Sequence, residues 1–495
     1  MSWDSLAVNA ATIRGVEAFR VSCEVSCGGG IPGISIVGLP DGSVLEARTR
    51  VRCAIRNCGF ELPRLHITVN LAPAELRKTG TGFDLPLAVG ILAATGQIPR
   101  GGLDGLLFVG ELGLDGSVNE SRGMVAYRHL ADSLGLRLVC APESPVGPDP
   151  QRTLGLSNLS QLRGGALRIP TLDAPVVSSV PPVSPEPLDY RDVVDQEMAK
   201  RALVIAAAGD HGLLMVGPPG SGKSMLAQRM TSILPPLHNS EREEALLVHS
   251  VAEEDIGGLL AGRRPFRSPH HSISCAGMIG GGRPVVPGEV SLAHGGVLFL
   301  DEIPEFASNV LQALRQPFEE HEVRLVRADG LYRFPCRFSF LAAANPCPCG
   351  HLGDIGRECR CSPAQIEKYQ SRVGGPLLDR IDMHIFVSRP DSRLVVRDEQ
   401  GTGSDEMREK VISAREYAAW RRGREPSEGR PTVSSLSLGA DARRSLEAIS
   451  RQLGLGGRAT VKVASVARTI ADLDHRARVS REDVGEACAY RERSR

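Results

Sequence analysis

The 495-residue sequence has no excess of either charge, because 58 lysines and arginines balance 58 aspartates and glutamates. A protein that binds nucleic acid through its bulk charge is strongly basic, so any such contact here must come from a local patch. Long apolar runs are also missing. The best stretch, Leu85–Ala94, holds ten residues, about half of what a membrane-spanning helix needs. The sequence therefore predicts no contact with the membrane.

The N-terminus lacks the cationic segment and apolar core of a secretory signal peptide, so we expect a cytoplasmic protein. Its 12 cysteines are then expected to be reduced thiols or metal ligands, because disulfides belong mainly to oxidising compartments. At this length we expect about three domains.

A glycine-rich segment lies between the apolar run 213–216 and a helix-like stretch. It consists of Gly217, Pro218, Pro219, Gly220, Ser221, Gly222, Lys223 and Ser224. Glycines let successive backbone N–H groups turn toward phosphates, and the following helix N-terminus adds partial positive charge. Lys223 can reach the β- and γ-phosphates, and Ser224 can bind Mg²⁺. An ordinary glycine turn is the competing interpretation, but the flanking strand and helix favour a site for a nucleoside triphosphate, ATP.

Residues 296–302 read Gly-Val-Leu-Phe-Leu-Asp-Glu. Four consecutive apolar residues predict a strand buried on both faces, as in a parallel sheet. Its carboxyl end carries Asp301 and Glu302, where open α/β sheets bind their ligands. Asp301 suits the Mg²⁺ shell, and Glu302 suits polarising the water that attacks the γ-phosphate. Solvated acids in a turn are the alternative for this pair.

Composition divides the chain into five parts. Residues 174–187 hold five prolines without helical or strand periodicity, which predicts a semi-stiff linker. We expect one domain at 1–173, a second at 188–390, a polar connecting segment at 391–431 and a helical unit at 432–495.

Several longer motifs carry a resemblance. They are Val193–Gln196, Phe266–His271, Gly280–Gly282, Pro287–His294, Leu314–Pro317, Asn345–Gly350, Leu377–Asp382 and Val466–Leu473. With these motifs the chain resembles, over essentially its full length, the ComM/YifB group of magnesium-chelatase-like AAA+ ATPases. The resemblance implies an α/β protein: an N-terminal α+β domain like that of Lon proteases, a central P-loop AAA+ core with a parallel sheet, and a C-terminal helical lid. It also implies a homo-hexameric ring with ATP sites between subunits.

The resemblance gives roles to residues outside the phosphate loop. Asn345, which ends the apolar run Phe338–Ala344, matches the sensor asparagine that helps to hold the attacking water. Arg380 matches the arginine that related ring ATPases insert into a neighbouring subunit's site. Arg458 matches the second sensor on the lid, and Arg468 is the other candidate for that role.

The N-terminal domain resembles the proteolytic domain of Lon-type proteases but lacks its catalytic pair. Strands are expected at Leu65–Leu71 and at Leu107–Leu112. The serine would lie at Gly82–Pro86 and the lysine at Gly123–Val125, and neither segment supplies it. Without nucleophile and base there is no covalent catalysis, so we expect a retained fold without peptidase activity.

Four cysteines form two closely spaced CxC pairs: Cys347 with Cys349, and Cys359 with Cys361. Four thiolates could close a tetrahedral Zn²⁺ site and stabilise a loop too polar to pack by itself. Four reduced thiols are the alternative, and Cys336 or His351 could substitute as a ligand. The adjacent His270 and His271 are expected to be structural or pore-facing.

Residues 323–338 read as a hairpin that carries Arg324, Arg327, Arg333 and Arg337. Arginines on such a hairpin can track a phosphate backbone without reading sequence. A second cluster, Arg415, Arg421, Arg422 and Arg424, could add contacts or form a solvated helix face. The resemblance favours an ATP-driven motor or helicase on branched or single-stranded DNA, for branch migration in recombination or the uptake of foreign DNA. A chelatase-type or chaperone-like ATPase acting on a protein partner is the alternative, and an ATP-dependent scaffold is a third.

Overall fold

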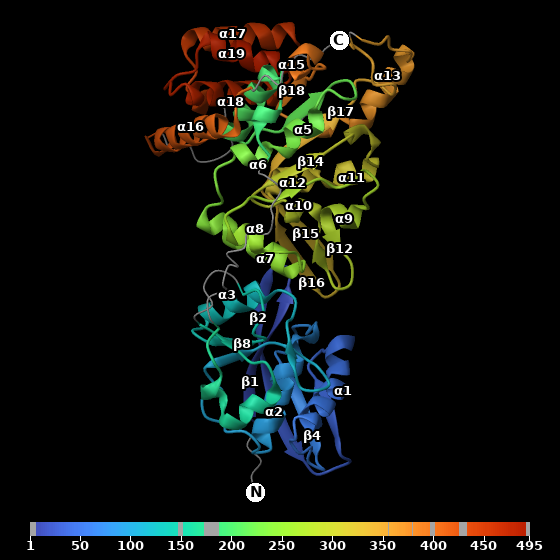
Figure 1. Ribbon diagram of the computed structural model, residues 1–495, viewed down its shortest axis with the longest axis vertical. Helices are drawn as coiled ribbons and strands as arrows, with labels where there is room; N and C mark the ends of the chain where they lie inside the picture. Colours follow the sequence, from blue (N-terminus) through green and yellow to red (C-terminus); the bar gives the residue numbers. More distant parts are fainter. Residues whose placement is uncertain are drawn as a thin grey trace.

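The computed structural model describes residues 6–146, 152–172, 188–354, 356–378, 380–396, 401–424 and 433–491. The molecule is elongated, with the N-terminal domain at one end, a parallel-sheet core in the middle and lid helices at the other end (Figure 1). The predicted linker at 174–187 lies outside the described residues.

A mixed seven-stranded sheet forms the N-terminal domain, in the order β3-β4-β2-β1-β5-β8-β9. The strands are β1 (Leu6–Arg14), β2 (Glu17–Gly28), β3 (Gly33–Val37), β4 (His66–Ala72), β5 (Leu106–Phe108), β8 (Arg137–Cys140) and β9 (Thr153–Gly155). Helices α1 (Gly42–Asn57) and α2 (Asp84–Ala94) share an apolar cluster with Val8 and Ala10 of β1. Helix α3 (Met124–Ser133) shares another with Ala11 and Ile13. Because side chains alternate along a strand, the helices cover opposite faces of the sheet.

The strand expected at Leu65–Leu71 is present as β4, but the one expected at Leu107–Leu112 is wrong as a single element. It divides into β5 and the short β6 (Glu111–Leu112), which pairs with β7 (Val118–Asn119). At the break, the N–H of Gly110 donates to the carbonyl of Gly82, and its carbonyl accepts from the N–H of Leu85. The chain therefore leaves the sheet at Gly110 to contact the start of α2.

The central core holds a five-stranded sheet in the order β11-β14-β17-β10-β18, and every neighbouring pair is parallel. The strands are β10 (Leu213–Val216), β11 (Phe266–Arg267), β14 (Val297–Leu300), β17 (Ser339–Ala344) and β18 (Met383–Phe386). All residues of β14 and β17 are buried, as their unbroken apolar runs predict. The expected parallel sheet is confirmed.

Short elements surround this sheet. The helices are α4 (Glu197–Gly209), α5 (Lys223–Gln228), α6 (Met230–Ile233), α7 (Asn239–Val251), α8 (Gly257–Leu260), α9 (Cys275–Ile279), α10 (Glu289–Leu292), α11 (Ser308–Ala313), α12 (Arg315–Glu320), α13 (Pro363–Gln370) and α14 (Gly375–Leu378). The pairs β12 (Gly280–Gly281) with β13 (Val286–Pro287) and β15 (Glu322–Arg327) with β16 (Gly330–Pro335) form antiparallel ribbons. The expected hairpin is therefore present as β15–β16.

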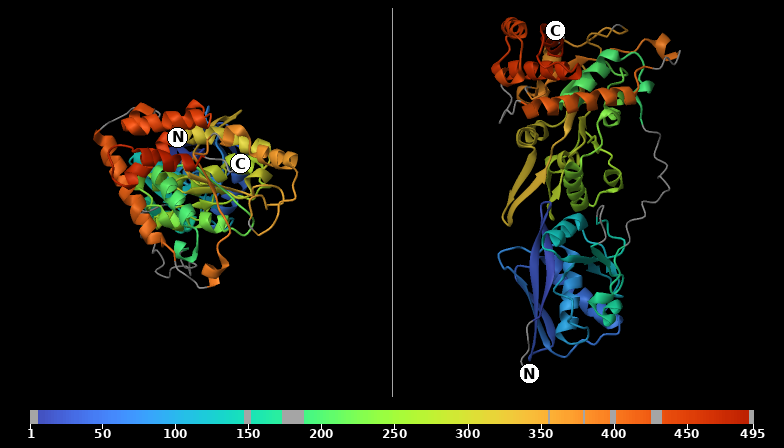
Figure 2. Two further views of the ribbon diagram at one scale, coloured as in Figure 1. Left: turned by 90° about the horizontal axis from the view of Figure 1, so that it is seen from above. Right: turned by 90° about the vertical axis from the view of Figure 1, so that its left-hand side faces the viewer.

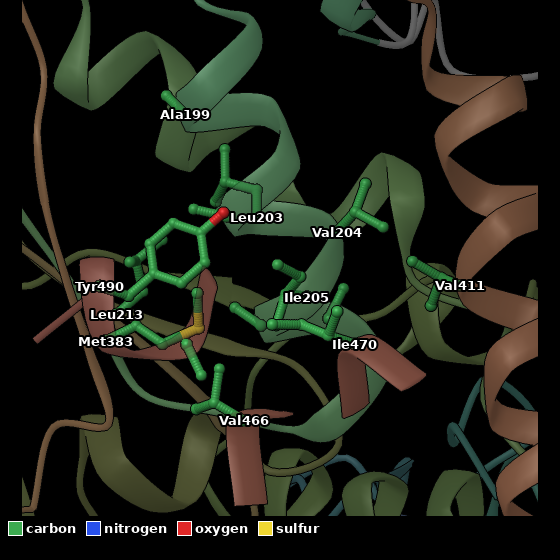
Figure 3. Close-up of a cluster of buried hydrophobic side chains, with 14 of the residues drawn as sticks. Ala199, Leu203, Val204, Ile205, Leu213, Met383, Val411, Val466, Ile470 and Tyr490 are labelled. Carbon is green, nitrogen blue, oxygen red and sulfur yellow. The ribbon is translucent and has the colours of Figure 1, made fainter. Parts of the chain in front are cut away.

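The lid consists of helices packed directly on the core. They are α15 (Ser392–Val396), α16 (Ser404–Arg424), α17 (Ala440–Gln452), α18 (Gly457–Leu473) and α19 (Arg481–Ala489). Val411 of α16 and Ile470 of α18 belong to the same buried apolar cluster as Leu203 and Ile205 of α4 (Figure 3). Since α16 packs on both α18 and α4, we count it with the lid rather than with a connecting segment.

In the described residues, the N-terminal domain meets the core at the start of α3 and at the ribbon β15–β16 (Figure 2). At the first, the start of α3 meets the end of α7: the N–H of Gly123 donates to the carbonyl of Ser250 at 3.1 Å, and the N–H of Val125 to the Ser250 hydroxyl at 3.2 Å. Val125 and Val251 are fully buried there. At the second, Arg77 lies 3.8 Å from Asp329 at the tip of β15–β16.

Across the described ranges, no helix combines the length and apolar character needed to cross a membrane. No disulfide joins any of the 12 cysteines, all of which lie in the described ranges.

Candidate active site

The phosphate loop follows β10 and leads into α5, as predicted. Gly220 and Gly222 have φ angles of 78° and 89°, in the left-handed region that favours glycine. Lys223 is buried, and its ammonium donates to the carbonyls of Gly217 at 2.8 Å and Pro218 at 2.9 Å. The side chain is thus held beneath the loop, where phosphates would bind.

Burial lowers the pKa of Lys223, and the nearby carboxylates of Asp301 and Glu302 oppose this shift. The three side chains therefore lie in one electrostatic environment, although Lys223 follows β10 and the two acids follow β14. The strand β17 separates β10 from β14 in the sheet, so this environment spans the carboxyl ends of three strands. That edge is where open α/β sheets bind ligands.

Ser224 and Asp301, the two residues predicted to bind Mg²⁺, lie side by side. The Ser224 hydroxyl donates to Oδ2 of Asp301 at 2.6 Å, and Oδ1 of Asp301 accepts from the N–H of Glu302 at 2.9 Å. Both side chains offer the hard oxygen atoms that Mg²⁺ requires. Their positions fit an ion held between the phosphate loop and β14.

Glu302 lies next to this pair with a φ of 51° and a side chain that is 55% exposed. A non-glycine residue in the left-handed region is uncommon and often marks a functional site. The carboxylate is open to the space where water would approach, and its Oε2 lies 3.9 Å from Nδ1 of His271. The sequence predicts a structural or pore-facing His271 and does not place it beside Glu302. The signal was its place just after β11, which pairs with β14.

Asn345 joins the same group from the end of β17. Its Oδ1 lies 3.4 Å from the ammonium of Lys223. The structure therefore brings together five of the predicted residues: Lys223, Ser224, Asp301, Glu302 and Asn345. They come from three neighbouring parallel strands, which explains how segments far apart in sequence meet.

The four cysteines also meet. Their Sγ atoms all lie within 4.8 Å of one another, and Sγ of Cys347 lies 3.4 Å from that of Cys349 and 3.6 Å from that of Cys359. Zn–S bonds of about 2.3 Å in a tetrahedron place sulfur atoms about 3.8 Å apart. Backbone N–H groups of His351 and Arg360 lower the pKa of Cys349 to about 6, whereas burial and the neighbouring thiols raise the pKa of Cys359 to about 12 and also raise that of Cys361. Cys349 is therefore the thiol of this cluster that most readily becomes a thiolate. The residues present fit a Zn²⁺ ion.

The two substitute ligands do not join this cluster. Cys336 is fully buried in an apolar cluster beneath β15–β16, and burial raises the pKa of its thiol to about 12. His351 lies 3.0 Å from Asp354 through its Nδ1, and Asp354 also lies 3.2 Å from Arg389.

The cysteine loop lies against the phosphate loop. A Cβ built on Gly350 would lie 2.8 Å from Cδ of Pro219. The first cysteine follows Asn345 by only two residues, and the amide of Gln370 in the next helix donates to the carbonyl of Pro346 at 3.0 Å. Order in the cysteine loop therefore bears directly on the phosphate loop and on Asn345.

The resemblance gave Arg380, Arg458 and Arg468 roles in ATP hydrolysis. Their side chains do not belong to the group around Lys223 described above. Arg380 forms an ion pair with Glu319 at the end of α12. Arg458 is exposed in the first turn of α18. Arg468 is 3% exposed, donates to the carbonyl of Ala477 and pairs with Asp472.

The structure separates the four hairpin arginines into two groups. Arg324 and Arg333 face each other across β15–β16, are exposed, and share Glu322 at 2.8 and 3.8 Å. Arg327 is exposed nearer the tip. Arg337 instead lies beyond the hairpin, at the amino end of β17, where its N–H donates to Nδ1 of His294.

A parallel sheet with a phosphate loop after one strand, a paired Asp-Glu after the next strand but one and a helical lid defines a P-loop ATPase. Family models sharpen this class: the one described as magnesium chelatase, subunit ChlI, matches residues 189–394. Those described as subunit ChlI of Mg-chelatase and as its C-terminal part match residues 23–144 and 401–491.

Among the relatives, several match along nearly their whole length. The uncharacterized protein YifB of Salmonella typhimurium is 40% identical over 98% of this chain and 96% of that protein. The competence protein ComM of Haemophilus influenzae is 40% identical over 96% of this chain and 95% of that protein. The chain therefore belongs to the ComM/YifB group of magnesium-chelatase-like AAA+ ATPases.

A shorter similarity agrees with the Lon-like character of the N-terminal domain. Lon protease 2 of Bacillus subtilis is 29% identical over 34% of this chain and 30% of that protein. The segment where a Lon-type lysine would lie, Gly123–Val125, is the one that packs on α7.

Proposed function

We propose that the protein is a ring-forming ATPase, a homo-hexamer, that uses Mg²⁺ and ATP to remodel DNA in recombination or natural transformation. The meeting of Lys223, Ser224, Asp301, Glu302 and Asn345 at one edge of the sheet carries the ATPase part of this proposal. The exposed arginines on β15–β16 and the relative named a competence protein support the DNA part.

Each residue in the site has a distinct task in hydrolysis. Lys223 binds the β- and γ-phosphates, and Ser224 with Asp301 holds the Mg²⁺ that neutralises their charge. Glu302 orients and polarises the attacking water, and Asn345 fixes that water from the other side. Arg380 acts from the neighbouring subunit, where a guanidinium stabilises the charge that develops on the transferred phosphoryl group.

The ribbon β15–β16 is the proposed contact to DNA. Its three exposed guanidinium groups, on Arg324, Arg327 and Arg333, lie on one two-stranded ribbon, so they can follow a phosphate backbone without reading bases. Val326, between two of them, is 80% exposed. A branched or single-stranded substrate would let the ribbon contact a separated strand.

We propose that the four cysteines hold one structural Zn²⁺. Its task is to order the segment between Asn345 and α13, and through Gly350 to support Pro219 of the phosphate loop. The ion has no place in the reaction itself, since its four ligands leave no open position.

A protein partner is the second candidate substrate, and one observation favours it. Glu320 and Glu322 lie 3.5 and 2.8 Å from the guanidinium of Arg324, so part of the ribbon's positive charge is already neutralised. The family description, magnesium chelatase, also names a class outside DNA metabolism.

DNA binding by an arginine variant separates these functions. Replacing Arg327 and Arg333 by alanine should weaken binding to a branched DNA by about tenfold or more. The slope of log K against log salt concentration should also decrease by about two, because two phosphate contacts are lost. Basal ATPase activity should remain, because these side chains lie away from the phosphate loop. The matched control replaces Arg444 and Arg451, exposed on α17, and should bind DNA normally. Unchanged DNA binding by the ribbon variant would favour the protein substrate.

A further inference from the structure

A cavity of about 610 Å³ lies between the lid and the core, and we call it the lid cavity. Its core wall includes residues 208–211, 294–296 and 337–339, which lie at or just before the starts of β10, β14 and β17. The phosphate loop follows β10 at the opposite end. Because a four-residue strand is about 13 Å long, the lid cavity is separate from the ATP site.

Arginines dominate the charge of this cavity. Six line it: Arg264, Arg337, Arg415, Arg421, Arg422 and Arg468. The four acidic residues in the wall are Asp210, Glu241, Glu244 and Asp472. The wall therefore has more cationic than anionic side chains.

Most of the acids are already engaged. Glu241 lies 3.1 Å from Arg264, and Glu244 lies 3.0 Å from His294. Asp472 accepts both Arg421, at 2.9 Å, and Arg468, at 3.1 Å. After these pairs are set aside, three cations of the wall remain, Arg337, Arg415 and Arg422, and one acid, Asp210. The carboxylate of Asp210 accepts a hydrogen bond from the Ser339 hydroxyl.

The three remaining arginines come from both sides of the cavity, the core and the lid. Arg337 comes from the core, whereas Arg415 and Arg422 come from α16 of the lid. Arg415 is fixed by two hydrogen bonds, at 3.0 and 2.6 Å, to the carbonyl of Ala207 at the end of α4. Arg337 and Arg422 are exposed, and within the described part of the chain neither has an ion-pair partner. A ligand that met all three would bridge the lid and the core.

We propose that the lid cavity is a second anion site, for a small molecule that carries two or more phosphate groups. Guanidinium forks bind phosphate oxygens bidentately, and two walls of arginines match two or more phosphates better than a single carboxylate. The volume lies in the range of small-molecule sites, about 300–1,000 Å³. Because its walls come from both parts, a ligand bound there ties α16 of the lid to the core.

Calorimetric titration with inorganic pyrophosphate tests the site. The full-length protein carries Lys223→Ala, which weakens phosphate binding at the ATP site, and should still bind pyrophosphate saturably at about one site per chain. Adding Arg337→Ala and Arg422→Ala should weaken that binding at least tenfold, as expected from the loss of two charge-assisted contacts. Both side chains are exposed, so this variant should keep the melting temperature of its parent.

Lys410→Ala is the matched control, because Lys410 is exposed on the same helix and does not line the cavity. It should leave pyrophosphate affinity unchanged. Absence of saturable binding, equal loss in the control, or unchanged binding in the double-arginine variant would each overturn the proposal. So would a double-arginine variant that loses single-stranded DNA while keeping pyrophosphate, since the arginines would then belong to a DNA path.

Discussion

The hydroxyl of Ser224 donates a 2.6 Å hydrogen bond to Asp301, although β17 lies between the two strands that precede these residues. One residue belongs to the helix after the phosphate loop and the other ends β14, so the bond joins the two halves of the proposed ATPase site. It places two hard oxygen ligands on one side of the space where the phosphates of ATP would lie. Substitutions around this bond should therefore separate ATP binding from ATP turnover.

Lys223→Ala should weaken ATP binding and abolish turnover, because the phosphates lose their buried cation. Glu302→Gln should bind ATP normally but hydrolyse it at least about 10²-fold more slowly, since the amide cannot act as a base toward water. Equilibrium binding of a fluorescent ATP analogue and steady-state phosphate release distinguish the two. Normal turnover by Glu302→Gln protein would remove Glu302 from the role of base.

A second prediction concerns the ring. If Arg380 acts in a neighbouring site, ATPase activity per chain should rise with protein concentration as rings form. Arg380→Ala should lose about 10³–10⁵ in rate if it behaves as other arginine fingers do. Mixing it with Lys223→Ala protein should restore part of the activity, because some interfaces then combine an intact phosphate loop with an intact arginine.

Concentration-independent activity without such complementation would contradict the shared site. The pairing of Arg380 with Glu319 supplies a further check. Glu319→Gln removes the partner and leaves the arginine, so it should retain activity far better than Arg380→Ala.

The zinc prediction rests on the contact between Gly350 and Pro219. Purified protein should carry about one zinc per chain, and Cys359→Ser with Cys361→Ser should lose it. Because the released loop no longer supports Pro219, the KM for ATP should rise several-fold. The control, Cys53→Ser with Cys275→Ser, changes two half-buried thiols outside the cluster and should keep both metal and KM. Elemental analysis of the unmodified protein without zinc would contradict the proposal.

The local parts of the site could be predicted from sequence because each is a short continuous motif. The phosphate loop and the acids after β14 follow from strand-end patterns, and the register that pairs Val216 with Ala344 then brings Asn345 beside Lys223. Parallel strands end at one edge of the sheet, so residues that follow such strands meet there. The role of Asn345 itself came from the family resemblance.

The positions of other residues could not be predicted, because they depend on the path of the chain after a motif ends. Arg337 is only four residues from Arg333, yet the chain leaves the ribbon at Pro335 and enters β17 from its amino end, at the lid cavity. Nothing in the local pattern distinguishes these two arginines. The docking of α3 on α7 is equally hidden, because it joins residues about 125 positions apart.

That docking gives the last prediction. Gly123 has a φ of 81°, and a Cβ there would lie 2.2 Å from Cδ1 of Ile13 and 3.3 Å from Cγ2 of Val251. Gly123→Ala should therefore cost about 1–3 kcal/mol of backbone strain and, in addition, displace α3 from α7. Gly135→Ala is the matched control: its φ is 68°, but nothing lies within 4 Å of the added Cβ. Hydrogen exchange should rise at residues 123–127 and 245–251 in the first variant only. Equal exchange in the two variants would mean that the backbone strain alone, and not the contact between the domains, sets the stability of this junction.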